Sequence, residues 1–174
     1  AFNLKILNFP AWETLPHEKL KPSSETIAER INTLNQLRSN EKVVVIAPVR
    51  SAIHEFSKKL AATEPLSVAR GRKLKIPDFA KRLINLSYER TDLVESRGEF
   101  AIRGGIIDLF PPQIEHPIRI DMFDDEIESI HTFSISDQRS IEGVTDLVEI
   151  LPCKELPANQ EGQLIIDQIG RAHV

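Results

Sequence analysis

The chain has 174 residues, of which 41% are hydrophobic and 28% charged, a composition typical of a globular protein with a buried core. Its net charge of -4 argues against a dominant nucleic-acid-binding surface, which usually shows a clustered excess of basic residues. The single cysteine, Cys153, excludes an internal disulfide, and no apolar run approaches the roughly 20 residues that a membrane span needs.

The first third of the chain has the pattern of an α/β domain. A serine, Ser23 or Ser24, can cap a helix whose apolar residues recur at helical spacing, with Arg30 on the solvated face. The apolar stripe consists of Ile27, Ile31, Leu34 and Leu37. The run Val43–Ala47 then predicts a strand buried on both faces, followed by a helix over Ser51–Leu60.

A helix, a strand and a helix suggest part of a parallel sheet, but one such unit cannot close a doubly wound fold. The chain also lacks an initiator methionine, so we expect it to be a fragment of a longer protein. The turn after the strand, Pro48–Ser51, contains no glycine, and no Gly-Lys-Ser/Thr sequence occurs anywhere. We therefore predict no nucleotide site and no bound cofactor in this chain.

Shorter elements follow from Pro65 onward and predict an α+β module. Leu66–Val68 is a candidate strand. A helix is expected near Pro77–Leu86, because proline is favoured in the first turn of a helix. The apolar side of this helix is formed by Phe79, Leu83 and Leu86. Glycines and prolines flank the strands that follow, beginning with Glu99–Arg103, so consecutive strands are expected to be antiparallel neighbours.

The strand Pro117–Phe123 carries the candidate binding residues. Period-2 alternation separates an apolar trio, expected to face the core, from two charged residues and an aromatic on the other face. The first set is Ile118, Ile120 and Met122, and the second is Arg119, Asp121 and Phe123. A large aromatic beside an arginine on a polar face is typical of a protein–protein hot spot. Arg103 joins this face if the pairing register allows it, which the sequence leaves open.

The acidic residues after this strand have two interpretations. Asp124, Asp125 and Glu126 follow directly and can form rim contacts to a basic partner. Clustered carboxylates also suit Mg²⁺, which makes residues 121–128 a candidate site of a magnesium-dependent enzyme. Their spacing favours a solvated turn before the strand Ile127–Phe133. We therefore predict no metal site and no catalytic residue.

Several strings in one order resemble a known family. RGGIIDLFP, PIRIDMFDDEIESIHTF, DQRS and LP resemble the UvrB-homology module near the N-terminus of the bacterial transcription-repair coupling factors, and FPAWETLPHEKLKPS resembles the segment before it. The resemblance covers roughly residues 6–156. It implies a cytoplasmic protein of an ATP-driven DNA translocase family, whose members remove RNA polymerase stalled at a lesion and bring in the excision-repair protein UvrA.

The same resemblance implies that this region is non-catalytic and recruits UvrA. By position, the family's UvrA contacts fall on Arg103, Arg119 and Phe123. The first domain of the family is a degenerate RecA/helicase-like domain without a phosphate loop, which agrees with the absence noted above. ATP, magnesium, RNA polymerase and DNA are then expected to bind elsewhere in a longer protein.

Together these observations predict three parts: a partial degenerate helicase-like α/β domain at 1–64, a UvrB domain 2-like module with an antiparallel sheet at 65–153, and a tail at 154–174. The last six residues, IGRAHV, are the translation of the start of a common sequencing-library adapter, so we expect 169–174 to be non-native. The alternative is a fragment of UvrB or of another helicase-type motor. UvrB should show an upstream phosphate loop and a long aromatic-rich hairpin before this module.

Overall fold

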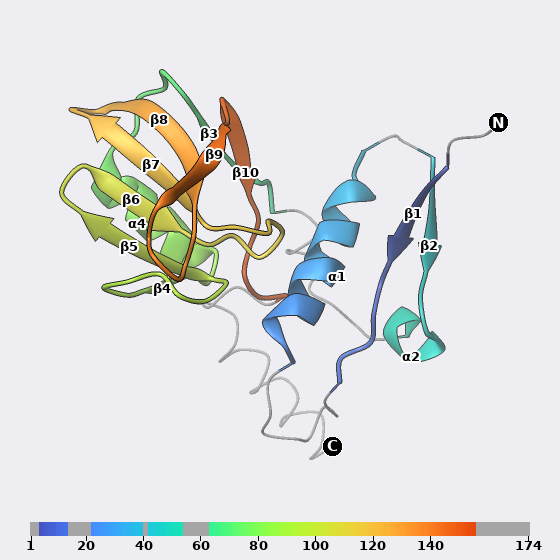
Figure 1. The fold of residues 1–174 in the computed structure, drawn as a ribbon. Coiled ribbons are helices and arrows are strands. Elements are labelled where there is room, and N and C mark those ends of the chain that lie inside the picture. The colour runs from blue at the N-terminus through green and yellow to red at the C-terminus, as the bar shows by residue number, and fades with distance from the viewer. Residues whose placement is uncertain (1–3, 14–21, 40–41, 54–62, 156–174) are drawn as a thin grey trace, which may run out of the picture.

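The computed structural model describes residues 4–13, 22–39, 42–53 and 63–155. The first elements of the chain are β1 (Lys5–Asn8), α1 (Ser24–Gln36), β2 (Val43–Ile46) and α2 (Val49–Ala52). Strands β1 and β2 pair in parallel, and Figure 1 shows α1 between this pair and the remainder of the molecule. The parallel pairing expected for this part of the chain is thus confirmed, whereas β1 was not predicted.

Helix α1 begins where the sequence indicates. Ser23 is the N-cap, and its hydroxyl oxygen accepts a hydrogen bond from the Thr26 amide at 3.1 Å. The carboxylate of Glu13 accepts hydrogen bonds from the Thr26 and Ser23 hydroxyls, which lower its pKa to about 2. These contacts join the residues after β1 to the first turn of α1.

Two expectations for the first part of the chain are wrong: the burial of the strand Val43–Ala47 and the solvent exposure of Arg30. The predicted strand Val43–Ala47 was to be buried on both faces, but Val44, Val45 and Ile46 of β2 are exposed, Ile46 by 57%. In the part of the chain that the structure describes, β1 and β2 form a two-stranded sheet, and burial of β2 on both faces would need layers packed on each face of that sheet. Most of the helix predicted over Ser51–Leu60 lies outside the described residues.

Arg30 is the second correction, because it was expected in solvent and is fully buried. Its guanidinium pairs with Glu155, donates to the Pro10 carbonyl at 2.7 Å, and lies 4.1 Å from the centroid of the Phe9 ring. Trp12 donates its indole N–H to the same Glu155 carboxylate at 2.9 Å. The helical pattern could not reveal this burial, because the partner lies 125 residues further along the chain.

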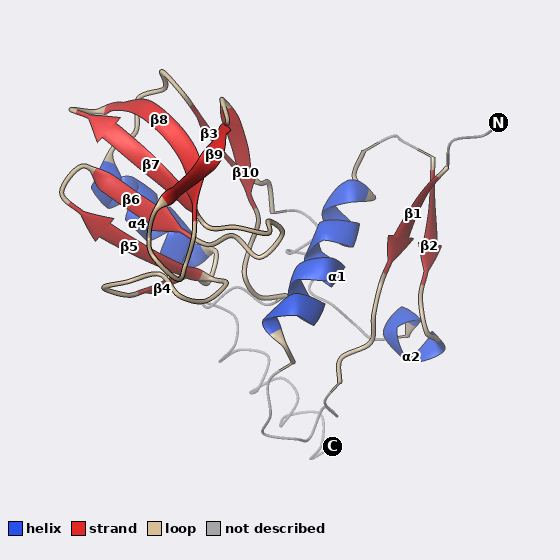
Figure 2. Cartoon of the chain, viewed as in Figure 1, coloured by secondary structure: helices blue, strands red, loops and turns tan. Residues whose placement is uncertain are grey.

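Residues 63–155 form a β-rich module (Figure 2). Its elements are β3 (Leu66–Ala69), α4 (Ile76–Asn85), β4 (Glu89–Arg90), β5 (Glu99–Arg103), β6 (Ile106–Leu109), β7 (Ile118–Phe123), β8 (Glu126–Phe133), β9 (Ser140–Val144) and β10 (Leu147–Ile150). Strands β4 to β9 form one sheet in chain order, and each pair from β5 to β8 is antiparallel, as predicted. Strand β9, which was not predicted, adds a further antiparallel neighbour to β8. Strands β3 and β10 form a separate antiparallel ribbon.

Helix α4 and the β3–β10 ribbon cover one face of the six-stranded sheet. Pro77 lies in the first turn of α4, and the predicted apolar side is confirmed by Phe79 and Leu83, which are buried. They pack in one cluster with the inward residues of the sheet. The cluster includes Phe100, Ile107, Leu109, Ile118, Ile120, Ile127 and Ile130. The inward alternation predicted for Ile118 and Ile120 is therefore confirmed.

The module leaves and rejoins the first part at α1. Near the end of α1, Arg38 donates a hydrogen bond to the Thr63 carbonyl at 2.6 Å, where the chain enters the module. Where the chain leaves it, Leu151 packs against Ile31. The predicted tail, 154–174, lies outside the described residues from position 156, including 169–174. None of the helices in the described ranges is long and apolar enough to cross a membrane.

Cys153 is partly buried and packs against the core cluster of the module. Its amide donates to the Leu86 carbonyl at 2.9 Å, and a Cβ on Gly98 would lie 3.3 Å from its Sγ. Burial raises the pKa of this thiol to about 12. We expect the native chain to react far more slowly with a thiol reagent such as Ellman's reagent than the chain unfolded in guanidinium chloride. Equal rates in the two states would contradict this environment.

Candidate functional site

The pairing register brings the candidate arginines together on the sheet face opposite α4. Ala101 of β5 and Arg119 of β7 both lie opposite Asp108 of β6. Residues that pair across neighbouring strands share a face, and Arg103 shares the face of Ala101 two residues away. The structure thus places Arg103, Asp108 and Arg119 on one side of the sheet, which answers the question of register that the sequence left open.

Asp108 links the two arginines. Its carboxylate is 1% exposed and forms ion pairs with both guanidinium groups. Arg119 binds it in a bidentate manner, with Nε 2.6 Å from Oδ1 and Nη2 2.9 Å from Oδ2, and Arg103 binds Oδ2 through Nη2. Fork-shaped pairs of this kind fix the orientation of both groups. The buried carboxylate of Asp108 therefore holds the guanidinium groups of Arg103 and Arg119 beside each other.

The two arginines differ in what they offer a partner. The Arg119 side chain is 16% exposed, lies 4.7 Å from the centroid of the Phe133 ring, and donates to the Gln138 carbonyl at 3.3 Å. Its hydrogen bond with Asp108 raises its already high pKa. Arg103 is 48% exposed. Arg119 is thus largely committed to the fold, whereas Arg103 keeps donors that a partner can reach.

Phe123 is a large apolar side chain of this face and is 74% exposed. It ends β7 beside a two-residue turn, and it lies opposite Glu126, the first residue of β8. Ile106, itself 37% exposed, lies on the same face as the diagonal neighbour of Phe123. The outward placement predicted for Phe123 is confirmed, and it forms the larger part of an exposed apolar spot at the end of the sheet.

The acidic residues of the candidate site point in different directions. Asp125 pairs with Lys73 on the α4 side at 3.1 Å, while Asp121 accepts a hydrogen bond from the Ser129 hydroxyl at 2.6 Å. Asp124 and Glu126 are exposed at the turn, and Asp124 has a φ of 56°. Within the described ranges, no group of three or more acidic, histidine or cysteine side chains is placed to hold a metal ion. The magnesium-enzyme alternative over 121–128 thus finds no assembled site there.

Sequence reasoning missed Asp108, although a signal for it exists. Ile106–Leu109 alternates so that Ile107 and Leu109 enter the core while Asp108 points to the opposite face. That face is itself partly covered, because a small buried cluster of Val94, Ala101, Phe110 and Phe133 lies on it. A carboxylate in the middle of a short apolar strand, between two strands that carry arginines, indicates a buried ion pair rather than a solvated acid.

Comparison with known proteins gives one consistent result. Residues 66–156 match the family described as the UvrB interaction domain. The chain is 36% identical over 181 residues to a transcription-repair-coupling factor of Mycobacterium bovis, 39% over 153 residues to that of Bacillus subtilis, and 34% over 160 residues to that of Escherichia coli. These alignments cover 99%, 87% and 89% of the chain but only 15%, 13% and 14% of the respective relatives.

Proposed function

The chain belongs to the UvrB interaction domain family found in transcription-repair-coupling factors, and from this membership we propose that it recruits UvrA to RNA polymerase stalled at a DNA lesion. Its DNA-repair role follows from the family; UvrA as the partner is the proposal. The observation that carries it is the joint placement of Arg103, Asp108 and Arg119 on a sheet face that ends in the exposed Phe123.

Phe123 is the proposed anchor of the complex. Moving a fully exposed aromatic side chain into an apolar pocket contributes about 1.5–3 kcal/mol, and most of Phe123 is available for such burial. Arg103, two strands away on the same face, supplies a charge-assisted hydrogen bond to a carboxylate of the partner. Arg119 has a different role: it holds Asp108 in place, and Asp108 in turn holds Arg103. Asp124 and Glu126 at the turn form the rim of the contact.

In this proposal the chain itself is non-catalytic and acts in the bacterial cytoplasm. It contains no Gly-Lys-Ser/Thr sequence with which to hold a nucleotide phosphate. ATP with magnesium, RNA polymerase and the DNA track of the motor then belong to parts of the coupling factor beyond this stretch, which spans about 15% of the M. bovis relative.

Alanine substitution of the anchor tests the proposal. We expect Phe123→Ala to weaken UvrA binding by about 30-fold or more, since truncation of a central hot-spot residue costs about 2 kcal/mol. The melting temperature should stay nearly unchanged because the side chain is exposed. Calorimetric titration with purified UvrA measures the affinity.

The matched control is Ile84→Ala, which removes an exposed apolar side chain, 49% accessible, on the other layer of the module. It should bind UvrA as the parent chain does. Arg103→Ala should fall between the two, with most of its loss vanishing at high salt. Parental affinity in a folded Phe123→Ala variant would refute the assignment.

A further inference from the structure

We propose a second interaction surface, a basic groove beside α4 that binds the phosphate backbone of nucleic acid. This α4 groove has a volume of about 400 Å³ and lies between β3, the segment before α4, and α4 itself. Its charged lining residues are Arg72, Lys73, Lys75, Asp78 and Arg82. The proposal concerns a partner other than UvrA and a different layer of the module, so it goes beyond the recruitment function.

The first observation is a local reversal of charge. The chain as a whole carries a net charge of -4, yet residues 70–82 contain six cations and one carboxylate. The cations are Arg70, Arg72, Lys73, Lys75, Lys81 and Arg82, and all six are exposed. Asp125 of the neighbouring turn pairs with Lys73 and offsets part of this charge. The remaining cations still give the groove a positive potential, which a concave wall strengthens.

The second observation is that most of these cations form no side-chain hydrogen bond or ion pair within the described part of the chain. Lys73 pairs with Asp125, which raises the pKa of Lys73, and Arg70 donates to the Glu128 carbonyl at 3.1 Å. The side chains of Arg72, Lys75 and Arg82 form no hydrogen bond or ion pair with any residue of the described ranges. The arginines of the other face, by contrast, are held by Asp108. Three cations of the α4 groove are therefore available to an external anion.

The spacing of the cations suits a repeating anion. Lys75 occupies the N-cap position of α4, and Arg82 lies seven residues later, which is about 10 Å along the helix axis. One strand of duplex DNA presents a phosphate roughly every 3.4 Å of its axis, so this distance covers about three phosphates. The planar guanidinium groups of Arg72 and Arg82 are suited to bidentate phosphate contacts. A nucleic-acid strand fits this arrangement better than a single small anion.

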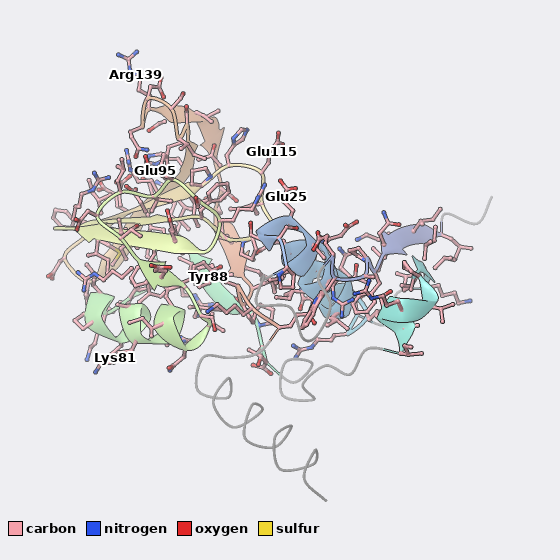
Figure 3. All side chains as sticks on the ribbon, turned by 90° about the horizontal axis from the view of Figure 1, so that it is seen from below. Glu25, Lys81, Tyr88, Glu95, Glu115 and Arg139 are labelled. Carbon is pink, nitrogen blue, oxygen red and sulfur yellow. The ribbon has the colours of Figure 1, made fainter. Side chains whose placement is uncertain are left out.

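The centres of the two proposed surfaces lie on opposite faces of the six-stranded sheet, and the surfaces adjoin only at the turn after β7, where Asp125 pairs with Lys73. Helix α4 packs against the inward face of the six-stranded sheet, whereas Arg103, Asp108 and Arg119 lie on the opposite face. Figure 3 shows Lys81 on α4 at one side of the module and Arg139, next to β9, at the other. The module can therefore hold a protein on one face while a nucleic-acid backbone lies against the other.

The experiment is a fluorescence-anisotropy titration of this chain with a labelled duplex oligonucleotide over a series of salt concentrations. We expect the logarithm of the binding constant to fall with the logarithm of salt with a slope of about -2 to -3, as for two to three phosphate contacts. The triple variant Arg72→Gln/Lys75→Gln/Arg82→Gln should bind at least about tenfold more weakly at low salt and lose most of this slope.

A matched triple variant separates the groove from net charge. Lys42→Gln/Arg90→Gln/Arg139→Gln removes two arginines and one lysine that are exposed outside the groove, so it reaches the same net charge. It should keep most of the parental affinity. Equal losses in the two triples, no salt-dependent binding by the parent chain, or equally tight binding of poly-glutamate in place of DNA would each overturn the proposal.

A second readout keeps this proposal apart from UvrA recruitment. The groove triple should bind UvrA as the parent chain does, and Phe123→Ala should bind the oligonucleotide as the parent chain does. Loss of DNA binding alone in the groove triple supports the α4 groove whatever the outcome with UvrA. Loss of UvrA binding in the groove triple, with DNA binding intact, would place the groove in the protein interface and refute its assignment to nucleic acid.

Discussion

Replacing Asp108 with asparagine is expected to lower the free energy of unfolding by about 3 kcal/mol and to weaken UvrA binding at least about tenfold. The substitution keeps the shape of the side chain but removes the one charge that Arg103 and Arg119 share. We expect most of the loss in stability to come from Arg119, which is mostly buried and would keep its charge without an ionic partner. The pair with Arg103 adds little, because that side chain is half exposed.

The matched control is Asp146→Asn, the same change at an exposed carboxylate between β9 and β10, which should alter stability by less than about 0.5 kcal/mol. Chemical denaturation gives the stabilities, and titration with UvrA gives the affinities. A double-mutant cycle with Arg103→Ala tests positioning directly: if Asp108 acts by orienting Arg103, the losses in binding should be far from additive. Additive losses would contradict that role and leave Asp108 with a purely structural one.

Breaking the buried pair of Arg30 and Glu155 should have the largest effect on stability. We expect Arg30→Ala to cost about 3–5 kcal/mol, because it leaves the carboxylate of Glu155, 4% exposed, without its ionic partner. The same substitution removes the guanidinium from the Phe9 ring and from the Pro10 carbonyl. Denaturant unfolding measures the loss, and Glu29→Ala, at an exposed position of α1, should change little.

The double variant Arg30→Met/Glu155→Leu distinguishes the loss of an interaction from the exposure of an unpaired charge. Apolar side chains of similar size remove both buried charges, so the double variant should recover a large part of the loss seen in Arg30→Ala. A double variant at least as unstable as the single one would mean that the hydrogen bonds to Pro10 and Trp12, rather than the charges, dominate at this place.

Sequence patterns correctly predicted the features that depend on residues close together in the chain. Alternation along β7 correctly placed Ile120 inside and Phe123 outside, because the two faces of a strand follow from the backbone alone. Pro77 and the apolar spacing after it identified α4 for the same reason. The antiparallel order of β5 to β8 followed from the turn residues between the strands.

What the sequence could not supply depends on contacts between distant segments. The burial of Arg30 requires a partner 125 residues away, and the shared use of Asp108 by two arginines requires the register of three strands. The prediction for the strand at Val43–Ile46 was wrong for a related reason. Its composition predicts burial, but burial of both faces needs layers packed on each face of the sheet, and Val44, Val45 and Ile46 remain exposed. The UvrA contact of Arg103, Arg119 and Phe123 remains a prediction.

The entry and exit of the module at α1 have a mechanical consequence. Thr63, Leu151 and Pro152 line one small space beside Ile31 and Arg38, so the chain returns almost to the point from which it left. Tension applied between the segments before and after the module then does not pass through the strands of the sheet. We expect it to act on α1 and on the contact of α1 with Glu155. The face that carries Phe123 is then expected to keep its shape under such a load.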